Sequence, residues 1–236
     1  MQLGIFLNSF VVEVESVNTV AKNQSIGIDL GIKTFAAMSN GEKVQSPNYS
    51  KIDGKIRKLQ RTLARQHKGS KRRNVTRIRI AKLHNEIADI RKDFLHKLSS
   101  RVIQENSFVV LEDLNVSGMV KNRRLARAIS LQGWREFRTL CEAKSNRFGR
   151  KFQAINRWEP TSQICSDCGY RWGKIDLSVR SIICLNCSSE QDRDENASRN
   201  IEKVGMGHRH DSKRAQRDGE TSPLAQPNEA SRIAAL

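Results

Sequence analysis

Four cysteines and a run of acidic residues lie close together between residues 163 and 201. The cysteines form two Cys-x-x-Cys pairs, Cys165/Cys168 and Cys184/Cys187. Each such turn places two thiolates on one side of a tight loop, so two turns supply the four corners of a zinc tetrahedron. The separation of the pairs is typical of a zinc ribbon built from two short hairpins. Because four protein ligands leave no open coordination position, we expect a structural Zn²⁺ rather than a catalytic one.

Two other interpretations of these cysteines are unrelated turns or a pair of disulfides. The sequence shows no secretory signal, and disulfides are rare in a reducing compartment, so the metal is favoured. The fifth cysteine, Cys141, falls in a helical pattern and is expected to be a small core residue.

The acidic run, Asp192-Arg-Asp194-Glu-Asn196, follows the second cysteine pair. Alone, such a run is typical of a solvated loop or a helix start. Two more acids stand at apolar strands: Asp29 after residues 26–28, and Glu112 after residues 108–111. An acid buried there is costly unless it is paired or binds a metal, although Asp29 by itself could also cap a turn.

If Asp29, Glu112 and Asp194 meet, they cannot all stay ionised without a cation. Hard oxygen ligands with vacancies for phosphate oxygens suit Mg²⁺. Two such ions about 3.5–4 Å apart could activate a water molecule and stabilise the leaving oxygen of a phosphodiester. The three acids therefore predict a Mg²⁺-dependent site, provided that the fold brings them together.

The order of the predicted elements indicates how that could happen. Strands are expected at residues 26–28, 33–38, 42–45, 108–111 and 151–155, and helices at 50–104, 130–148 and 195–204. The Asn40-Gly41 pair marks a hairpin turn between the second and third strands. A meander of three strands, then a strand, a helix, a strand and a closing helix predicts an α/β, RNase H-like (RuvC-type) core. That fold brings an acid of the first strand, one of the fourth and one of the last helix to one place.

Residues 50–104 are predicted to form a helical hairpin that turns at His67–Ser70. Residues 51–82 contain thirteen Lys/Arg and only one acid, Asp53. A solvated helix face usually mixes charge signs, so this segment favours contact with nucleic-acid phosphates over an ordinary surface. The candidate contacts are Lys71, Arg72, Arg73, Arg77 and Arg79.

The composition agrees with a polyanionic partner. The 236 residues contain 42 Lys/Arg against 25 Asp/Glu, which gives a formal net charge of +17, and nucleic acid is the usual partner of such an excess. No apolar run reaches the ~18 residues of a membrane span. We therefore expect a cytoplasmic, nucleoid-associated prokaryotic protein that binds DNA and no membrane. The sequence does not indicate an oligomeric state.

Three segments together resemble a known family. GIDLGIKTFA around Asp29, VLEDLNVSGM around Glu112, and the cysteine-rich stretch ending in DRDENASRNI look like the RuvC-type motifs and zinc ribbon of the TnpB (OrfB) proteins of insertion sequences. These proteins are related to the type V CRISPR effector nucleases, and many are named transposases. The resemblance covers residues 5–204. It implies a Mg²⁺-dependent DNA endonuclease, an activity in transposition and DNA recombination, and a guide RNA from the transposon end.

Carried over by residue, the resemblance implies that Asp29, Glu112 and Asp194 are the catalytic, Mg²⁺-binding acids. Asp194 is preferred to Asp192 because the family's Asp precedes the x-Asn-Ala part of the run. The four paired cysteines match its zinc ligands. Two positions depart from the family pattern: Ser188 stands where the second pair usually continues with Gly, and Gln191 stands where the acidic run usually begins with His.

The same reasoning divides the chain. Residues 1–24 are expected to be a remnant of an N-terminal β domain, and residues 205–236 a disordered tail. The nuclease core takes residues 25–160 and 191–204, with the basic hairpin 50–104 inserted, and the zinc ribbon takes 161–190.

Full-length TnpB proteins carry a larger N-terminal part, so two functions stay open. The first is a nuclease core that cleaves DNA. The second is a truncated DNA- or RNA-binding relic or regulator without efficient cleavage. A zinc ribbon that only scaffolds partners would leave the two strand-borne acids unexplained.

Overall fold

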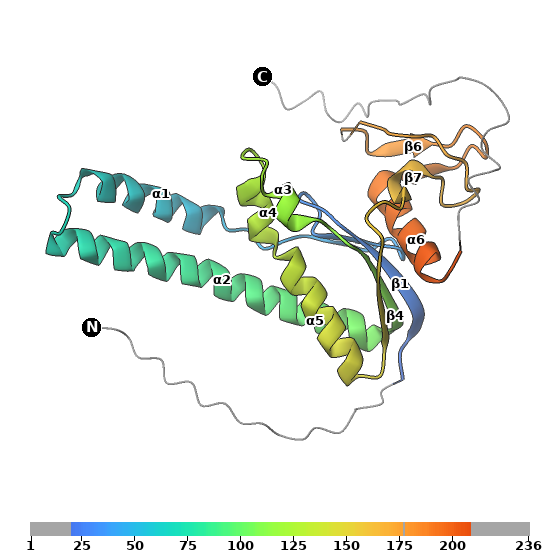
Figure 1. Cartoon of the computed structure of the whole chain (residues 1–236), viewed down its shortest axis with the longest axis horizontal. Coiled ribbons are helices and arrows are strands. Elements are labelled where there is room, and N and C mark those ends of the chain that lie inside the picture. The colour runs from blue at the N-terminus through green and yellow to red at the C-terminus, as the bar shows by residue number, and fades with distance from the viewer. Residues whose placement is uncertain (1–19, 177, 209–236) are drawn as a thin grey trace.

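The computed structural model describes residues 20–176 and 178–208, which form a mixed α/β fold around one five-stranded sheet (Figure 1). The strands, listed in spatial order, are β3 (Lys43–Val44), β2 (Ala36–Met38), β1 (Asn23–Leu30), β4 (Asn106–Glu112) and β5 (Lys151–Ile155). β2 is antiparallel to both β1 and β3, whereas β1, β4 and β5 run parallel. The five predicted strands are all present, although β2 begins at Ala36 rather than at residue 33. A hydrogen bond of 3.2 Å from Gly31 N to Phe35 O closes the preceding residues into a loop.

Helices cover both faces of the sheet, so its central strands are apolar on both sides. Val109 and Leu111 of β4 face a core built with α2 (Lys71–Glu105) and α5 (Trp134–Arg147). Val110 points the other way, toward Ile201 of α6 (Arg193–Gly205). Successive side chains of a strand alternate between its faces, so one strand serves both layers. Cys141 is fully buried in the first core, as the sequence predicted.

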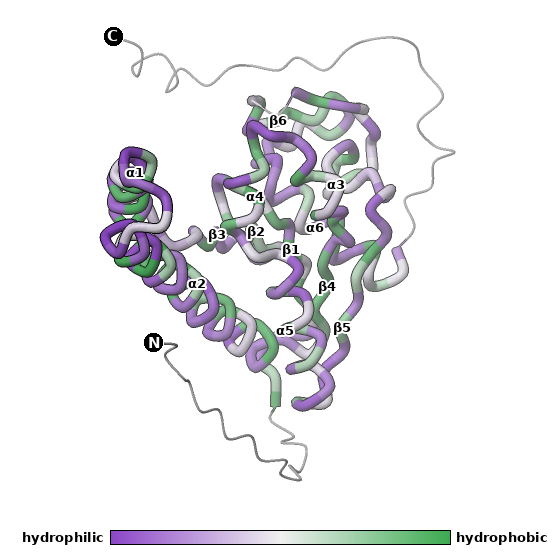
Figure 2. The backbone as a smooth tube through the Cα atoms, turned by 60° about the vertical axis from the view of Figure 1, so that its left-hand side comes forward, coloured by the Kyte–Doolittle hydropathy of each residue, from purple (hydrophilic) through white to green (hydrophobic). Residues whose placement is uncertain are grey.

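The predicted basic hairpin is confirmed as α1 (Ser50–Arg65) and α2, which turn at Gly69 with φ +86°. Its outer half has its own small core, including Ile56 and Ile87. Ile90, farther along α2, is exposed. The reason is that α2 changes partner along its length, from α1 to the sheet. Figure 2 shows the hairpin standing apart from the sheet, with many hydrophilic residues at its outer end.

The helix predicted over residues 130–148 is in fact two, α4 (Ala126–Gln132) and α5. Gly133 separates them in the left-handed conformation with φ +73°, which favours glycine. A Cβ atom there would also lie 3.0 Å from Leu95 Cδ1. A short helix, α3 (Val116–Met119), follows β4.

The predicted N-terminal remnant and C-terminal tail fall mostly on residues 1–19 and 209–236, which lie outside the described residues. Of the segments the structure does describe, no helix is long and apolar enough to cross a membrane.

Candidate active site and metal centre

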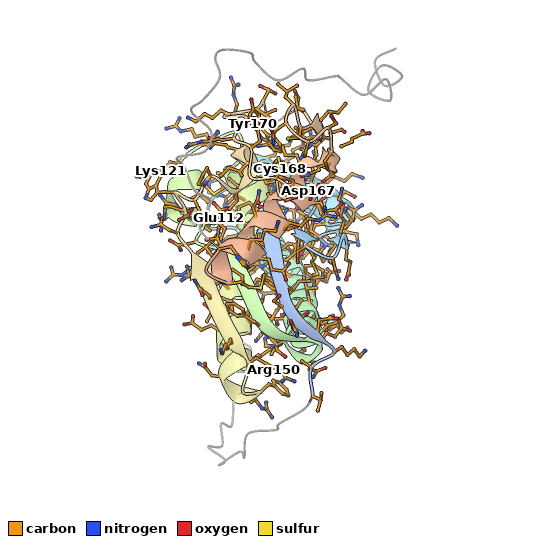
Figure 3. All side chains as sticks on the ribbon, turned by 90° about the vertical axis from the view of Figure 1, so that its right-hand side faces the viewer. Glu112, Lys121, Arg150, Asp167, Cys168 and Tyr170 are labelled. Carbon is orange, nitrogen blue, oxygen red and sulfur yellow. The ribbon has the colours of Figure 1, made fainter. Side chains whose placement is uncertain are left out.

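The sheet and α6 bring the three predicted acids to one pocket. Asp29 stands near the end of β1 and Glu112 is the last residue of β4; because Ile28 pairs with Leu111 in this parallel pair, both acids emerge at the same sheet edge. Asp194 lies in the first turn of α6. All three line a pocket of about 430 Å³. Figure 3 shows Glu112 toward the end of the sheet opposite to that of Arg150.

The close packing of α6 on β1 fixes this arrangement. A Cβ atom on Gly27 would lie 2.1 Å from Ser198 O and 2.6 Å from Glu202 N. Only glycine lets the helix backbone approach the strand so closely. The first turn of α6 is thereby held over the strand end that carries Asp29.

Burial and neighbouring negative charge raise the pKa values of Asp29 and Glu112. Desolvation by burial, followed by repulsion from Glu112 and Asp194, raises the pKa of Asp29 to about 7. Burial and then the charge of Asp113 raise the pKa of Glu112. Crowded carboxylates of this kind become fully ionised only when positive charge compensates them. The donor set therefore fits a hard divalent cation such as Mg²⁺.

Basic side chains share the pocket with the acids. They are Lys33, Arg157, Arg180 and Arg193. Arg180 Nη1 lies 3.1 and 3.2 Å from the two carboxylate oxygens of Asp194. Arg157 donates to Asp113, the residue after Glu112. Sequence reasoning assigned no role to these residues, because a basic side chain shows its ionic partner only in the folded structure.

Asp192 and Asp194 have different surroundings. Asp192 caps α6, because its Oδ1 accepts from Asp194 N at 3.0 Å and from Glu195 N at 3.1 Å. Its other oxygen pairs with Lys43 Nζ at 2.7 Å. Asp192 thus serves as a structural cap, whereas Asp194 is turned toward the pocket.

The four paired cysteines form a compact cluster whose sulfur atoms all lie within 4.8 Å of one another. The Sγ atoms are 3.7 Å apart for Cys165 and Cys187, and 3.6 Å apart for Cys168 and Cys184. A zinc tetrahedron with Zn–S bonds of about 2.3 Å has edges of about 3.8 Å, so these thiols fit Zn²⁺. Trp172 and Ile182 pack beside the cluster, and β6 (Ser181–Ile183) pairs with β7 (Glu190–Asp192) next to it.

Polar side chains of α6 attach the cysteine cluster to the acids. Asn196 accepts from Ser166 N at 2.7 Å and donates to Ile164 O at 2.9 Å. One turn later, Asn200 donates to Thr161 O and Ile164 O, each at 2.7 Å. Both amides are buried. The helix that carries Asp194 is therefore bonded to the backbone that carries Cys165.

The predicted phosphate contacts lie at the outer end of the hairpin (Figure 1), and the structure distinguishes one of them. Lys71, Arg72, Arg77 and Arg79 are exposed. Arg73 is half-buried and donates to Leu63 O and, at 3.2 Å, to Gln66 O. It therefore closes the C-terminal end of α1.

Comparison with known proteins identifies the family. Residues 9–123 match OrfB_IS605, described as "Probable transposase", and residues 134–201 match the "Cas12f1-like, TNB domain". A Streptomyces pristinaespiralis protein named "Putative RNA-guided DNA endonuclease" is 43% identical over 187 residues. This chain belongs to the OrfB/TnpB family.

Other relatives agree with this assignment. The Escherichia coli K12 protein "Putative RNA-guided DNA endonuclease InsQ" is 32% identical over 199 residues. The alignments cover 79% and 78% of this chain but 46% and 49% of the two bacterial proteins, so the chain spans about half the length of these TnpB relatives. A cryo-EM structure titled as a Cas12f1-sgRNA-target DNA complex shares the fold, with a TM-score of 0.55, 18% identity, and coverage of 79% of this chain and 51% of that one.

Both departures from the TnpB pattern are accommodated in the ribbon. Ser188 adopts φ +57°, the left-handed conformation that glycine would adopt easily. Gln191 is buried, and its Nε2 donates to Cys165 Sγ at 3.4 Å and to Asp167 Oδ2 at 2.8 Å. Such bonds orient a metal ligand from behind. Neither replacement removes a cysteine from the cluster.

Proposed function

We propose that this chain forms the catalytic core of a TnpB-type nuclease with an RNase H-like, RuvC-type fold, and that it hydrolyses DNA phosphodiesters. The observation that carries the proposal is the shared pocket of Asp29, Glu112 and Asp194, three acids from three different elements. The strand order β3-β2-β1-β4-β5, in which only β2 runs opposite to the other four strands, supports the fold assignment.

Mg²⁺ bound by the three carboxylates would supply Lewis acidity and an activated water. The chain's own residues have the complementary tasks. The acids hold the cation charge at the sheet edge. Lys33, Arg157 and Arg193, which line the same pocket, would bind the phosphate backbone of the substrate. Arg180, which is now paired with Asp194, would be available to bind a phosphate if that carboxylate held the cation.

The ribbon would hold a structural Zn²⁺ on Cys165, Cys168, Cys184 and Cys187. Its task is to position α6 and Arg180, not to react with the substrate. The hydrogen bonds of Asn196 and Asn200 support this, because they join the ribbon backbone directly to the helix of Asp194.

The partners would be target DNA and a guide RNA from the transposon end, so that the protein associates with the nucleoid. The names of the two bacterial relatives support an RNA-guided activity. The exposed lysine and arginine side chains at the start of α2 offer a phosphate-binding surface away from the pocket. The relatives are about twice as long as the part of them that this chain spans. We therefore propose guided cleavage for a protein of the relatives' length, in which residues like those of this chain form the nuclease core.

A DNA- or RNA-binding protein without efficient cleavage is the second candidate. The observation that favours it is the ion pair of Arg180 with Asp194, which engages one of the three acids. Binding through the basic hairpin would not need the pocket at all.

Cleavage of labelled single- and double-stranded DNA with Mg²⁺ or Mn²⁺, with and without guide RNA, separates the two candidates. Asp29→Asn is expected to abolish cleavage while DNA binding persists. The Asp29 carboxylate would bind the cation, whereas the basic hairpin, which would bind DNA, is unchanged in this variant. Asp89→Asn, an exposed acid on α2, is the matched control and should cut like the parent. If the parent binds DNA but never cuts it, the binding role replaces the nuclease role; if Asp29→Asn cuts normally, the site lies elsewhere.

A further inference from the structure

The most exposed aromatic side chain of the described residues lies beside the acidic pocket. Trp158 is 83% exposed, whereas the other two tryptophans, Trp134 and Trp172, are 3% and 8% exposed. Its neighbours in sequence, Arg157 and Glu159, both line the pocket of the three acids. The backbone of Trp158 therefore lies at the rim of the proposed active site, and its exposed indole is accessible to a ligand there.

The turn that carries Trp158 is held in place. Asn156 Oδ1 accepts from Trp158 N at 3.1 Å, and Asn156 O accepts from Glu159 N at 3.1 Å. Arg157 anchors the turn to Asp113, directly after Glu112. An aromatic ring on a fixed turn loses little conformational entropy when a ligand covers it, which favours a binding role.

The surrounding charge specifies the ligand. Lys33, Arg157, Arg180 and Arg193 balance the charge of the acids that line the same pocket, and they supply donors for the phosphates of a strand that passes it. Basic grooves beside exposed aromatic rings are how proteins hold single-stranded nucleic acid, with bases stacked on the rings. A base inside a duplex is already stacked on both sides and would have to leave the helix first.

We propose that Trp158 is a stacking platform for a nucleobase of single-stranded DNA whose backbone enters the acidic pocket. This inference rests on the proposed nuclease function and assigns its substrate at that site: an unpaired strand, gripped by one base beside the phosphate. It also assigns a positioning residue that nothing in the sequence motifs marks.

Fluorescence titration of the whole chain tests the idea without any cleavage. The probe is a single-stranded thymidine oligomer, added without Mg²⁺ so that the DNA stays intact and without a chelator so that the ribbon keeps its zinc. Stacking should quench the emission of Trp158. In Trp158→Ala most of this quenching should be lost, because Trp134 and Trp172 are only 3% and 8% exposed, and affinity should fall about 5- to 150-fold, the range for one base–aromatic stack. Trp158→Phe should keep most of the affinity.

Two controls separate the contribution of base stacking to affinity from the contribution of the phosphate charges. An abasic oligomer of equal length keeps the phosphates, and it should bind the parent as weakly as the thymidine oligomer binds Trp158→Ala. Leu185→Ala removes another exposed apolar side chain, 43% exposed, from the ribbon and should not change affinity. Equal affinity of Trp158→Ala and parent, or of abasic and thymidine oligomers, would overturn the inference.

The failure of the nuclease proposal has a different signature. Should that proposal fail, no cleavage would occur with Mg²⁺, although binding would still depend on Trp158. Should the stacking proposal fail, cleavage that depends on Asp29 would proceed with the same KM in Trp158→Ala as in the parent.

Discussion

The proton of Asp29 is coupled to folding, because this carboxyl is packed against a strand end with two acidic neighbours. Its pKa is raised to about 7 in the folded protein, from an ordinary value of 3.8. The folded state therefore binds the proton more tightly than the unfolded state. As pH rises from about 4 to about 7, this group makes the metal-free protein progressively less stable, and above pH 7 the loss is complete.

Asp29→Asn should remove this loss of folding stability at high pH. In metal-free protein the variant is expected to match the parent near pH 4 and to exceed its free energy of unfolding at pH 8 by up to about 4 kcal/mol, the limit set by the pKa shift. Urea unfolding at a series of pH values measures the difference. A constant difference between pH 4 and 8 would show that Asp29 ionises normally.

A second prediction at the scale of single residues concerns zinc binding by the cysteine cluster. The protein is expected to contain one zinc per chain, and Cys184→Ser should lose it together with the fold of the ribbon, because structural zinc binding is coupled to local folding. Cys141→Ala, which alters a cysteine outside the cluster, should keep its zinc. Metal analysis and NMR of the ribbon amides check both; a zinc-free parent with an ordered ribbon would refute the assignment.

At the scale of elements, α6 joins the ribbon to the sheet. Its Asn196 amide is buried and bonds the backbone of residues 164 and 166. Asn196→Ala leaves these buried groups with fewer partners and should cost about 1–3 kcal/mol of stability. Arg199→Ala, which breaks only the partly exposed ion pair with Glu195, should cost less than about 1 kcal/mol. Thermal unfolding compares the two, and equal costs would argue against the amide link.

The sequence predicts these elements well where their cause is local. Apolar strands that end in Asp29 and Glu112 are visible as patterns, and so is the Gly69 turn of the basic hairpin. The break at Gly133 is harder to predict, because a glycine inside an amphipathic pattern is tolerated in many helices. Here it is required by a left-handed backbone and by Leu95 on another helix.

Residues that act through distant partners escape sequence reasoning altogether. Arg180 contacts Asp194 across the ribbon, and Arg73 binds carbonyls of α1, yet both appear as ordinary basic residues in the chain. Asp192 and Asp194 are also equivalent by composition. Without the family resemblance, only the cap and the Lys43 ion pair separate their tasks.

For the whole molecule, the charge of the hairpin should control nucleic-acid binding. Arg72→Gln removes an exposed arginine and should reduce the slope of log affinity against log salt by ~0.9 on duplex DNA, as expected for one lost phosphate contact. Arg73→Gln removes the same charge one residue later. It should lower stability and leave the slope nearly unchanged, because this side chain binds the end of α1.

Filter-binding titrations over a range of salt concentrations measure both slopes. Identical slopes in the parent and in Arg72→Gln would make this surface an ordinary solvated one. A large slope change in Arg73→Gln would mean that its bonds to α1 are exchanged for phosphate.

Helix α2 has a mechanical consequence. It is one unbroken helix of 35 residues, about 50 Å long, and β4 begins at the very next residue, Asn106. No slack connects the two, and Leu98, Val102 and Ile103 of the helix are buried in the core, so the outer end of the hairpin is held rigidly to the sheet that carries Glu112. A pair of glycines at residues 89 and 90 would make the helix flexible there, so that the outer end of the hairpin could bind a ligand without a change in the position of the acids.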